Sequence, residues 1–158
     1  MFGRKAQGTT EYLIILAVII VIALVVVGVM GWVPGLSGGI TEQQSRVYWQ
    51  STAPFTIVEY KFDAGLGTAS LEVQNVSANK LELTGVDFEG IAGTVTGQPI
   101  SFNAGERKLV SVTGLTGTTC ETSAAGTGFD YTTIITYDSK NVTGLKQIGD
   151  KSLIGKCN

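Results

Sequence analysis

The sequence predicts an α+β protein in which a long apolar N-terminal helix precedes an all-β sandwich head. Residues 12–33 contain no side chain that ionises near neutral pH, and the run is apolar on every face rather than along one stripe. Residues 51–158 instead show short runs of alternating apolar and polar residues separated by glycine, a pattern typical of strands joined by turns. We therefore expect a helical segment over residues 7–50 and a head domain over residues 51–158.

The apolar segment has the length of a membrane span. At a rise of about 1.5 Å per residue it would form a helix of roughly 33 Å, which matches a bilayer core of about 30 Å. Arg4 and Lys5 precede the segment and predict a cytoplasmic N-terminal end with an exported C-terminal bulk. A cleaved secretory signal is the weaker alternative, because its apolar core would be shorter and a small-residue cleavage site would follow it.

A second helical piece is expected after a break. Pro34 and the glycines that follow it disfavour continued helix, so the helical stalk is expected to bend near Pro34. Trp32 falls where an interfacial anchor would lie. Thr41 and Gln44 have the spacing of a capping box, which predicts a second helix from Thr41 to about Gln50.

Eight strands are predicted in the head. Strand centres about ten to fifteen residues apart suit a two-sheet sandwich. Residues 113–128 are rich in glycine, serine and threonine, and we interpret them as an exposed loop in preference to a dedicated binding surface. The predicted strands cover residues 56–62, 70–76, 80–88, 91–95, 108–112, 131–137, 145–148 and 152–154.

The residues before the apolar run carry a family resemblance. Arg4, Lys5 and Ala6 are followed by Gln-Gly-Thr-Thr-Glu-Tyr at residues 7–12, and this pattern resembles the class III signal peptide of archaeal type IV-like pilins, the adhesion pilins in particular. The resemblance implies that a prepilin peptidase cuts between Ala6 and Gln7, so that residues 1–6 are a cleaved leader. Residues 48–65 and 149–158 also resemble the heads of archaeal pilins, whose fold is an immunoglobulin-like sandwich.

The function that this resemblance implies is that of a structural subunit in an extracellular pilus at the cell surface, serving adhesion and cell aggregation. The subunit would polymerise through its N-terminal helix into a helical filament of identical subunits, since a contact that does not close into a ring propagates as a fibre. The implied partners are further copies of the chain, the plasma membrane before assembly, the prepilin peptidase and the assembly machinery. Two alternatives stay open: a single-pass anchored surface protein with a binding head, and a minor pilin or archaellin-like subunit.

Glu11 has two interpretations. A carboxylate in the first turn of a helix interacts favourably with the helix dipole, whatever the protein does. Alternatively, a carboxylate at the edge of an apolar segment needs a cation, and after cleavage the new α-amino group of Gln7 on a neighbouring subunit would be available. The second interpretation makes Glu11 and Gln7 assembly residues.

The expected export of the head makes disulfide formation and N-glycosylation possible. Cys120 and Cys157 would usually oxidise outside the cytosol, and the long loop they close would contribute about 4 kcal/mol; two separate buried thiols are the alternative. The sequons Asn75-Val76-Ser77 and Asn141-Val142-Thr143 make Asn75 and Asn141 candidates for N-glycosylation.

Composition argues against several functions. The formal net charge of −2 gives no basis for a nucleic-acid surface, and the chain has no histidine for acid–base work or for most zinc and haem sites. No nucleophile with a partner base and no phosphate-cradling loop is apparent. Asp87 and Glu89, spaced to face the same way on a strand, suggest a calcium site only weakly. We expect neither an enzyme, nor a cofactor, nor a bound metal.

Overall fold

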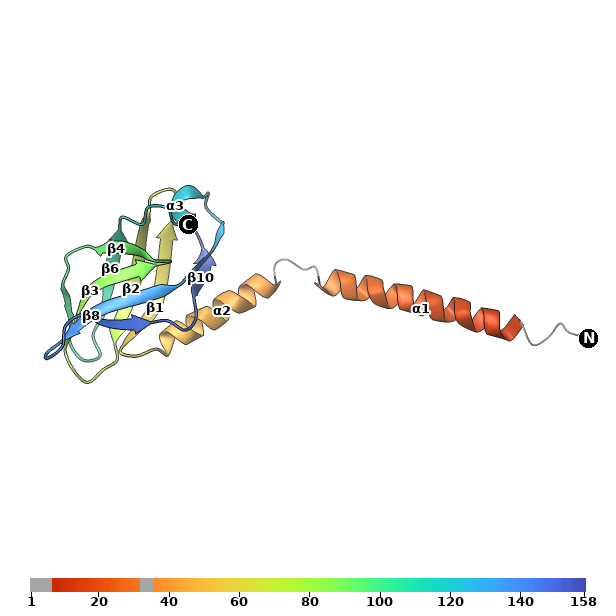
Figure 1. Cartoon of the computed structure of the whole chain (residues 1–158), viewed down its shortest axis with the longest axis horizontal. Coiled ribbons are helices and arrows are strands. Elements are labelled where there is room, and N and C mark those ends of the chain that lie inside the picture. Colours follow the sequence, from red (N-terminus) through yellow and green to blue (C-terminus); the bar gives the residue numbers. More distant parts are fainter. Residues whose placement is uncertain (1–6, 32–35) are drawn as a thin grey trace, which may run out of the picture. The chain divides into compact units, whose positions relative to one another are not determined.

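The computed structural model describes residues 7–31 and 36–158, and the side chains of residues 8, 10–26 and 41–158. The chain divides into two compact units, with the boundary between Gly39 and Ile40. Figure 1 labels most of the elements. The predicted leader, Trp32 and Pro34 lie outside the described residues, and so does the predicted bend.

Two helices occupy the N-terminal part of the chain, α1 (Gln7–Gly31) and α2 (Leu36–Gln50). The predicted end of the second helix at Gln50 is confirmed, whereas its predicted start at Thr41 is wrong. A helix that has begun gains one hydrogen bond for each residue added, which offsets the low propensity of Gly38 and Gly39, about 1 kcal/mol each. The capping-box spacing at Thr41 therefore falls inside the helix instead of at its start.

Among the helices of the described residues, none combines the length and the hydropathy that crossing a membrane requires. The predicted transmembrane helix is thus not found there. Most of the regular structure is β, so the α+β class is also corrected to a mainly β protein.

The second unit contains residues 40–50 of α2, ten strands between Phe55 and Lys156, and the short helix α3 (Thr119–Thr122). Seven predicted strands are confirmed to within about two residues, and the eighth, residues 131–137, is divided between β7 and β8. The three-residue strand β5 was not predicted. The strands are β1 (Phe55–Asp63), β2 (Thr68–Asn75), β3 (Leu81–Phe88), β4 (Ile91–Val95), β5 (Ile100–Phe102), β6 (Arg107–Thr113), β7 (Gly128–Tyr131), β8 (Thr133–Ser139), β9 (Leu145–Ile148) and β10 (Leu153–Lys156).

Eight of these strands form one curled antiparallel sheet in the order β1-β2-β6-β4-β3-β8-β9, with β5 pairing β3 beside β4, and β7 and β10 form a separate ribbon. Strand β4 makes the sheet continuous, because its start pairs with β3 and its last residues, Thr94 and Val95, pair with β6. Gly93 permits this crossing: a Cβ atom there would lie 2.2 Å from a methyl carbon of Val112. The two-sheet, immunoglobulin-like sandwich is therefore wrong.

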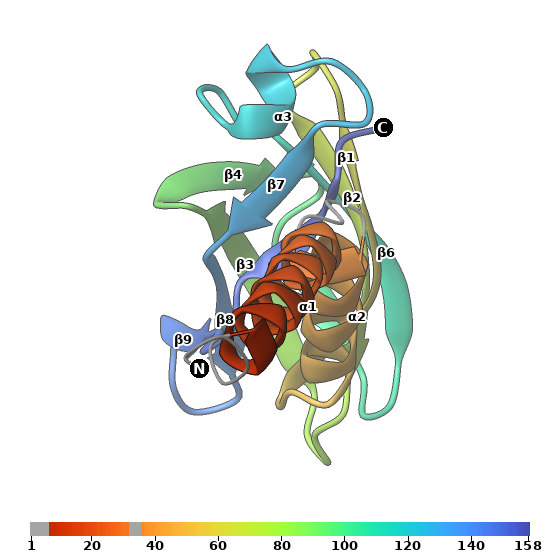
Figure 2. The ribbon, with the colours of Figure 1, turned by 90° about the vertical axis from the view of Figure 1, so that its right-hand side faces the viewer.

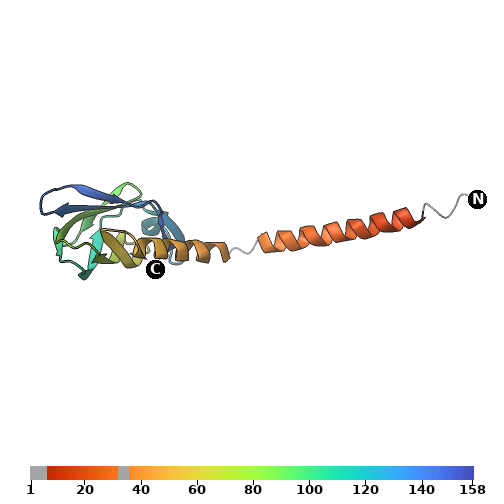
Figure 3. The same ribbon diagram turned by 90° about the horizontal axis from the view of Figure 1, so that it is seen from below.

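The curl brings the last strand of the sheet back to the first. Gln147 of β9 is buried, and its side-chain Oε1 accepts from the Phe55 backbone N–H at 3.0 Å while its Nε2 donates to the Phe55 carbonyl at 2.8 Å. The side-chain amide of Gln147 thus makes the two hydrogen bonds to Phe55 that a neighbouring strand would otherwise make. Figures 2 and 3 show β6 and β9 on opposite sides of the domain, as the curl requires.

The core lies inside the curl and is rich in aromatic rings. Along β2 every second residue is buried, namely Ala69, Leu71, Val73 and Asn75, which is the period of a strand with one buried face. Phe62 lies at the centre of the ring cluster, with edge contacts at centroid distances of 4.9 Å to Phe88 and 5.1 Å to Tyr131. Rings packed in this way stabilise a domain beyond their buried area alone.

Candidate functional site

The side chains of α1 form a surface that nothing in the described structure covers. Its large apolar residues are between 39% exposed, at Leu16, and 66% exposed, at Leu24. Because an α-helix turns once in 3.6 residues, exposure at consecutive positions means that every face of the helix is apolar. We call this set the apolar helix surface: Tyr12, Leu13, Ile14, Ile15, Leu16, Val18, Ile19, Ile20, Val21, Ile22, Leu24, Val25 and Val26.

A continuous apolar surface of this kind is unusual on a soluble domain. Complete burial of one Val, Leu or Ile side chain contributes about 1.5–3 kcal/mol. One neighbouring helix would cover only a stripe of α1, since helices contact each other along a limited face.

The predicted assembly residues lie at the start of α1. Glu11 is exposed and is the single charged residue of the helix. The first turn of α1 contains no acidic residue, and the helix dipole acts mainly within that turn, so the dipole interpretation of Glu11 is wrong. Gln7 begins α1, although its side chain is not described, and Ala6 lies outside the described residues. The predicted cut between Ala6 and Gln7 stays a prediction.

The described part of α2 is fixed to the C-terminal segment of the head. The buried Ser45 hydroxyl donates to the Ser152 carbonyl at 2.7 Å and accepts from the Ile154 N–H at 3.1 Å. Trp49 is fully buried and packs so closely on Gly149 that a Cβ atom there would lie 2.2 Å from the indole ring. Sequence reasoning did not identify these contacts, because they join residues about a hundred positions apart.

Arg46 ties the same helix to strand β1. Its guanidinium lies 2.9 Å from Glu59 and 3.3 Å from Glu42, and its centre is 4.8 Å from the centroid of the Tyr60 ring. Burial alone would lower the pKa of Arg46, but the hydrogen bond to Glu59 and the neighbouring charges raise it overall. Burial raises the pKa of Tyr60, against the opposing charge of Arg46, and its hydroxyl donates to the Ile154 carbonyl.

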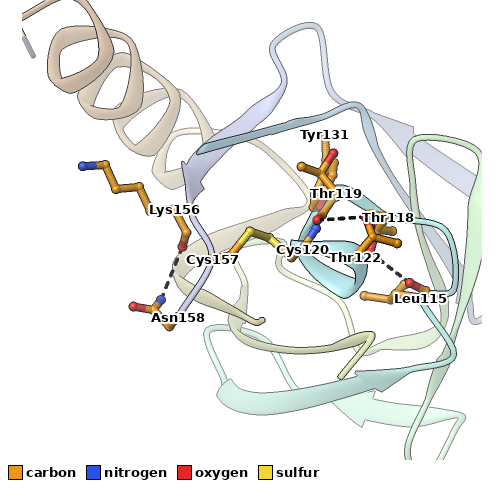
Figure 4. Close-up of a disulfide and its surroundings, with 9 residues drawn as sticks. All are labelled: Leu115, Thr118, Thr119, Cys120, Thr122, Tyr131, Lys156, Cys157 and Asn158. Carbon is orange, nitrogen blue, oxygen red and sulfur yellow. Dashed lines mark hydrogen bonds between the residues drawn. A yellow bond between two sulfur atoms is a disulfide. The ribbon is translucent and has the colours of Figure 1, made fainter. Parts of the chain in front are cut away.

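Cys120 and Cys157 form the predicted disulfide, so the alternative of two separate thiols is wrong. Their Cα atoms lie 5.3 Å apart, and both residues are buried. Figure 4 shows the bridge joining α3 to the C-terminal residues. The Cys120 N–H donates to the Tyr131 hydroxyl at 2.8 Å, and the Cys157 N–H donates to the Thr127 carbonyl at 2.8 Å. The bridge and these bonds hold the end of the chain against the domain.

Residues 113–128 are not the plain exposed loop that was predicted. Leu115 and Thr118 are 1% exposed, and Cys120 is 2% exposed. The Thr118 hydroxyl donates to the Leu115 carbonyl at 2.9 Å just before α3. The disulfide and the apolar contact of Leu115 place this polar-looking segment against the core.

The two predicted glycosylation sites differ in access. Asn75 is 0% exposed, and its Nδ2 donates to the carbonyls of Asn79 at 2.8 Å, Asn103 at 3.2 Å and Phe102 at 3.3 Å. Asn75 therefore does not qualify as an acceptor in the folded protein. Asn141 is exposed in the turn between β8 and β9 and remains a candidate.

The weak calcium suggestion gains no support, since the part of the chain that the structure describes contains no group of three or more metal-ligating His, Cys, Asp or Glu side chains. Glu89 instead lies at the tip of the β3–β4 hairpin with a φ of 53° beside Gly90. A turn with two successive positive φ values is a usual two-residue hairpin connection.

The comparison with models of protein families finds no match for this chain, and the comparison with curated protein sequences also finds none.

Proposed function

We propose that this chain is a structural subunit of an extracellular filament at the cell surface, of the archaeal type IV-like pilin kind, and that it polymerises through α1. The apolar helix surface is the observation that carries the proposal. It needs several neighbouring helices to cover it, and further copies of the same chain supply identical apolar helices. A contact between different faces of identical helices repeats without closing, and so generates a fibre.

The proposal depends on contacts between helices of different subunits and not on a membrane crossing. An apolar helix that leaves water for a bundle of similar helices gains the burial free energy of its exposed side chains, about 25 cal/mol per Å² of apolar area. The head domain already buries its own apolar residues, as the fully buried Phe55, Leu71 and Phe88 illustrate. In the filament, the helices would form the centre and the heads the outer surface.

Glu11 supports a defined arrangement of the helices. In a bundle of apolar helices, its carboxylate would be removed from water, which is costly for an unpaired charge. We propose that prepilin peptidase cuts between Ala6 and Gln7 and that the new α-amino group of Gln7 pairs with Glu11 of a neighbouring subunit. A pairing of this kind would set the register between copies.

The disulfide supports an exported head, because such bridges persist in oxidising compartments. Both cysteines are buried, and the bridge fixes the C-terminal residues that could otherwise fray. These features suit a surface-exposed role in adhesion and cell aggregation.

The test is to shear filaments from the cells, image them, and identify their subunits by mass spectrometry and N-terminal sequencing. We expect this chain in the filaments with Gln7 as its first residue. Ile19→Lys should abolish incorporation, whereas Leu109→Lys, at a head residue that is 70% exposed, should assemble normally. Recovery of the chain only outside filaments, with residues 1–6 attached, would contradict the proposal.

A further inference from the structure

The turn between β8 and β9 presents Asn141 as an accessible and well-positioned side chain. The Ser139 N–H donates to the Val142 carbonyl at 2.8 Å, and the Gly144 N–H donates to Asp138 Oδ1 at 2.6 Å, so the backbone is fixed on both sides of Asn141. All three sequon residues, 141–143, are exposed. Within the described part of the chain the Asn141 side-chain amide makes no hydrogen bond, in contrast to the amide of Asn75.

A polar cavity of about 400 Å³ adjoins this turn. Its volume lies within the range of ligand pockets, about 300–1,000 Å³. Two of its lining residues, Ser139 and Lys140, immediately precede Asn141 in the chain, so a group attached to Asn141 would start close to the cavity. The cavity is lined by Asn79, Lys80, Glu82, Asp138, Ser139 and Lys140.

The charges in this cavity are only partly neutralised. Glu82 of β3 pairs directly opposite Asp138 of β8, an arrangement of like charges that destabilises a sheet unless a third group intervenes. Lys80 lies 3.5 Å from Glu82 Oε1, which also accepts from Ser101. Within the described residues, Glu82 Oε2, Asp138 Oδ2 and Lys140 Nζ have no protein partner.

Two carboxylate acceptors and an ammonium donor around a polar cavity match the hydroxyl groups of a saccharide. We propose that Asn141 carries an N-linked glycan whose first sugars lie in this cavity, and that Asn75 is not modified. The inference rests on the proposed function, because glycosylation requires the head to be exported. A free saccharide from the surroundings would offer the same hydroxyl groups, and the experiments below separate the two sources.

The attachment step is a glycosyl transfer catalysed by a transferase of the host cell. The amide nitrogen of Asn141 attacks the anomeric carbon of a sugar on a phosphate-activated donor. The new N–C bond forms as the C–O bond to phosphate breaks, the leaving phosphate keeps the bonding electrons, and the amide loses one proton to a base of the transferase. The Asn75 nitrogen cannot take this part after folding, because three backbone carbonyls hold it.

The first experiment is peptide mapping by mass spectrometry of the wild type, Thr143→Ala and Ser77→Ala, each of which removes one sequon without changing its asparagine. We expect a mass increment on the Asn141 peptide in the wild type and in Ser77→Ala, and none in Thr143→Ala. An unmodified Asn141, or an increment on Asn75, would overturn the inference. Chain recovered from whole cells is mapped beside chain from filaments, so this result is independent of whether filaments contain it.

The second experiment tests whether the glycan lies in the cavity, by comparing melting temperatures with and without the glycan in a double-mutant cycle. Loss of the glycan through Thr143→Ala should lower the melting temperature, and Glu82→Ala should reduce that difference by at least half. Lys146→Ala, at an exposed residue of β9 that does not line the cavity, should leave the difference unchanged. An equal difference in all three backgrounds would overturn the cavity assignment. Glycan released from the wild type is then added to Thr143→Ala. If this free glycan binds to the cavity although the attached glycan gives no melting shift, the cavity binds a free saccharide and the proposal fails.

Discussion

Helix α1 and the head place the same kinds of residue in opposite environments. In the head, the core valine, leucine, isoleucine and phenylalanine side chains are buried inside the curl, and most of the largest are less than 2% exposed. In α1, the same aliphatic residues occur at nearly every position and are roughly half exposed. The head therefore completes its own core within one chain, whereas the apolar side chains of α1 stay exposed in the described structure.

The strongest test of this comparison is to truncate one large apolar side chain in each region. Phe62→Ala should lower the free energy of unfolding of the unassembled chain by about 3–5 kcal/mol, because it leaves a cavity among Phe88, Phe129 and Tyr131. Ile20→Ala in α1 should change it by less than about 0.5 kcal/mol. Denaturant unfolding followed by near-ultraviolet dichroism measures both. A large loss at Ile20 would show that α1 already has a partner within the chain.

Removal of the disulfide should have the next largest effect on the head. The bridge joins residues separated by 37 positions, and the chain-entropy relation gives a contribution of about 4 kcal/mol for such a loop. The double variant Cys120→Ala, Cys157→Ala should therefore unfold at a much lower denaturant concentration. The control is Ser123→Ala, beside the bridge. Unchanged stability of the double variant would mean that the C-terminal hydrogen bonds suffice to hold the segment.

A smaller loss is expected at the point where the curled sheet returns on itself. Gln147→Leu keeps the volume but leaves the Phe55 N–H without its partner and the Phe55 carbonyl with only the Thr52 hydroxyl at 2.8 Å, at a cost of about 1–3 kcal/mol. Ile148→Ala, at a residue of the same strand that is 65% exposed, should have little effect. Thermal unfolding of both variants makes the comparison. Equal losses would mean that burial along β9, and not the amide of Gln147, holds the sheet closed.

The smallest expected effect depends on pH. A hydrogen bond from Lys61 holds the pKa of Asp63 below its ordinary value of 3.8, and a bond from Thr68 acts in the same direction. A lowered pKa stabilises the folded state above the unfolded value, and that stabilisation disappears as the pH falls through the folded value. Because Lys61 is 56% exposed, we expect Asp63→Asn to cost at most about 1 kcal/mol at pH 7.

This difference between the wild type and Asp63→Asn should decrease from pH 7 toward pH 2, as the Asp63 carboxyl takes up its proton. Urea unfolding at the two pH values measures it. Asp130→Asn, at an exposed residue of β7, is the control for the loss of one carboxylate. A difference that persists at low pH would point to the shape of the side chain instead of its charge.

Local patterns predicted the strands well because an alternating run specifies both the strand and its buried face. The same patterns could not predict the pairing of β4 with both β3 and β6, since alternation does not say which edges meet. The burial of Asn75 could have been predicted, because Asn75 continues the buried series Ala69, Leu71 and Val73 at a spacing of two residues. The prediction of glycosylation at Asn75 rested on the sequon and not on the position of Asn75 in the strand.

In the helical part, the sequence predicted the apolar run but neither the start of α2 nor its contacts with the head. Composition identified the apolar run, but the start of α2 at Leu36 depends on helix propagation through weak residues, which single-residue propensities underestimate. The anchoring contacts of Ser45 and Trp49 join residues about a hundred positions apart, so no local signal predicts them. In the candidate site, the apolar helix surface was visible in the sequence, whereas the network of Arg46, Glu59 and Tyr60 required the fold.

The outer edge of β1 is covered by other segments of the same chain. At Phe55 the edge is occupied by Gln147, at Val58 by the side chain of Gln50, and at Phe62 and Ala64 by the backbone of Asn158. An uncovered strand edge is a template on which a second chain can add a strand, which leads to aggregation and domain swapping. Because its own chain occupies these positions of the edge, a strand of a second copy cannot pair with β1 there.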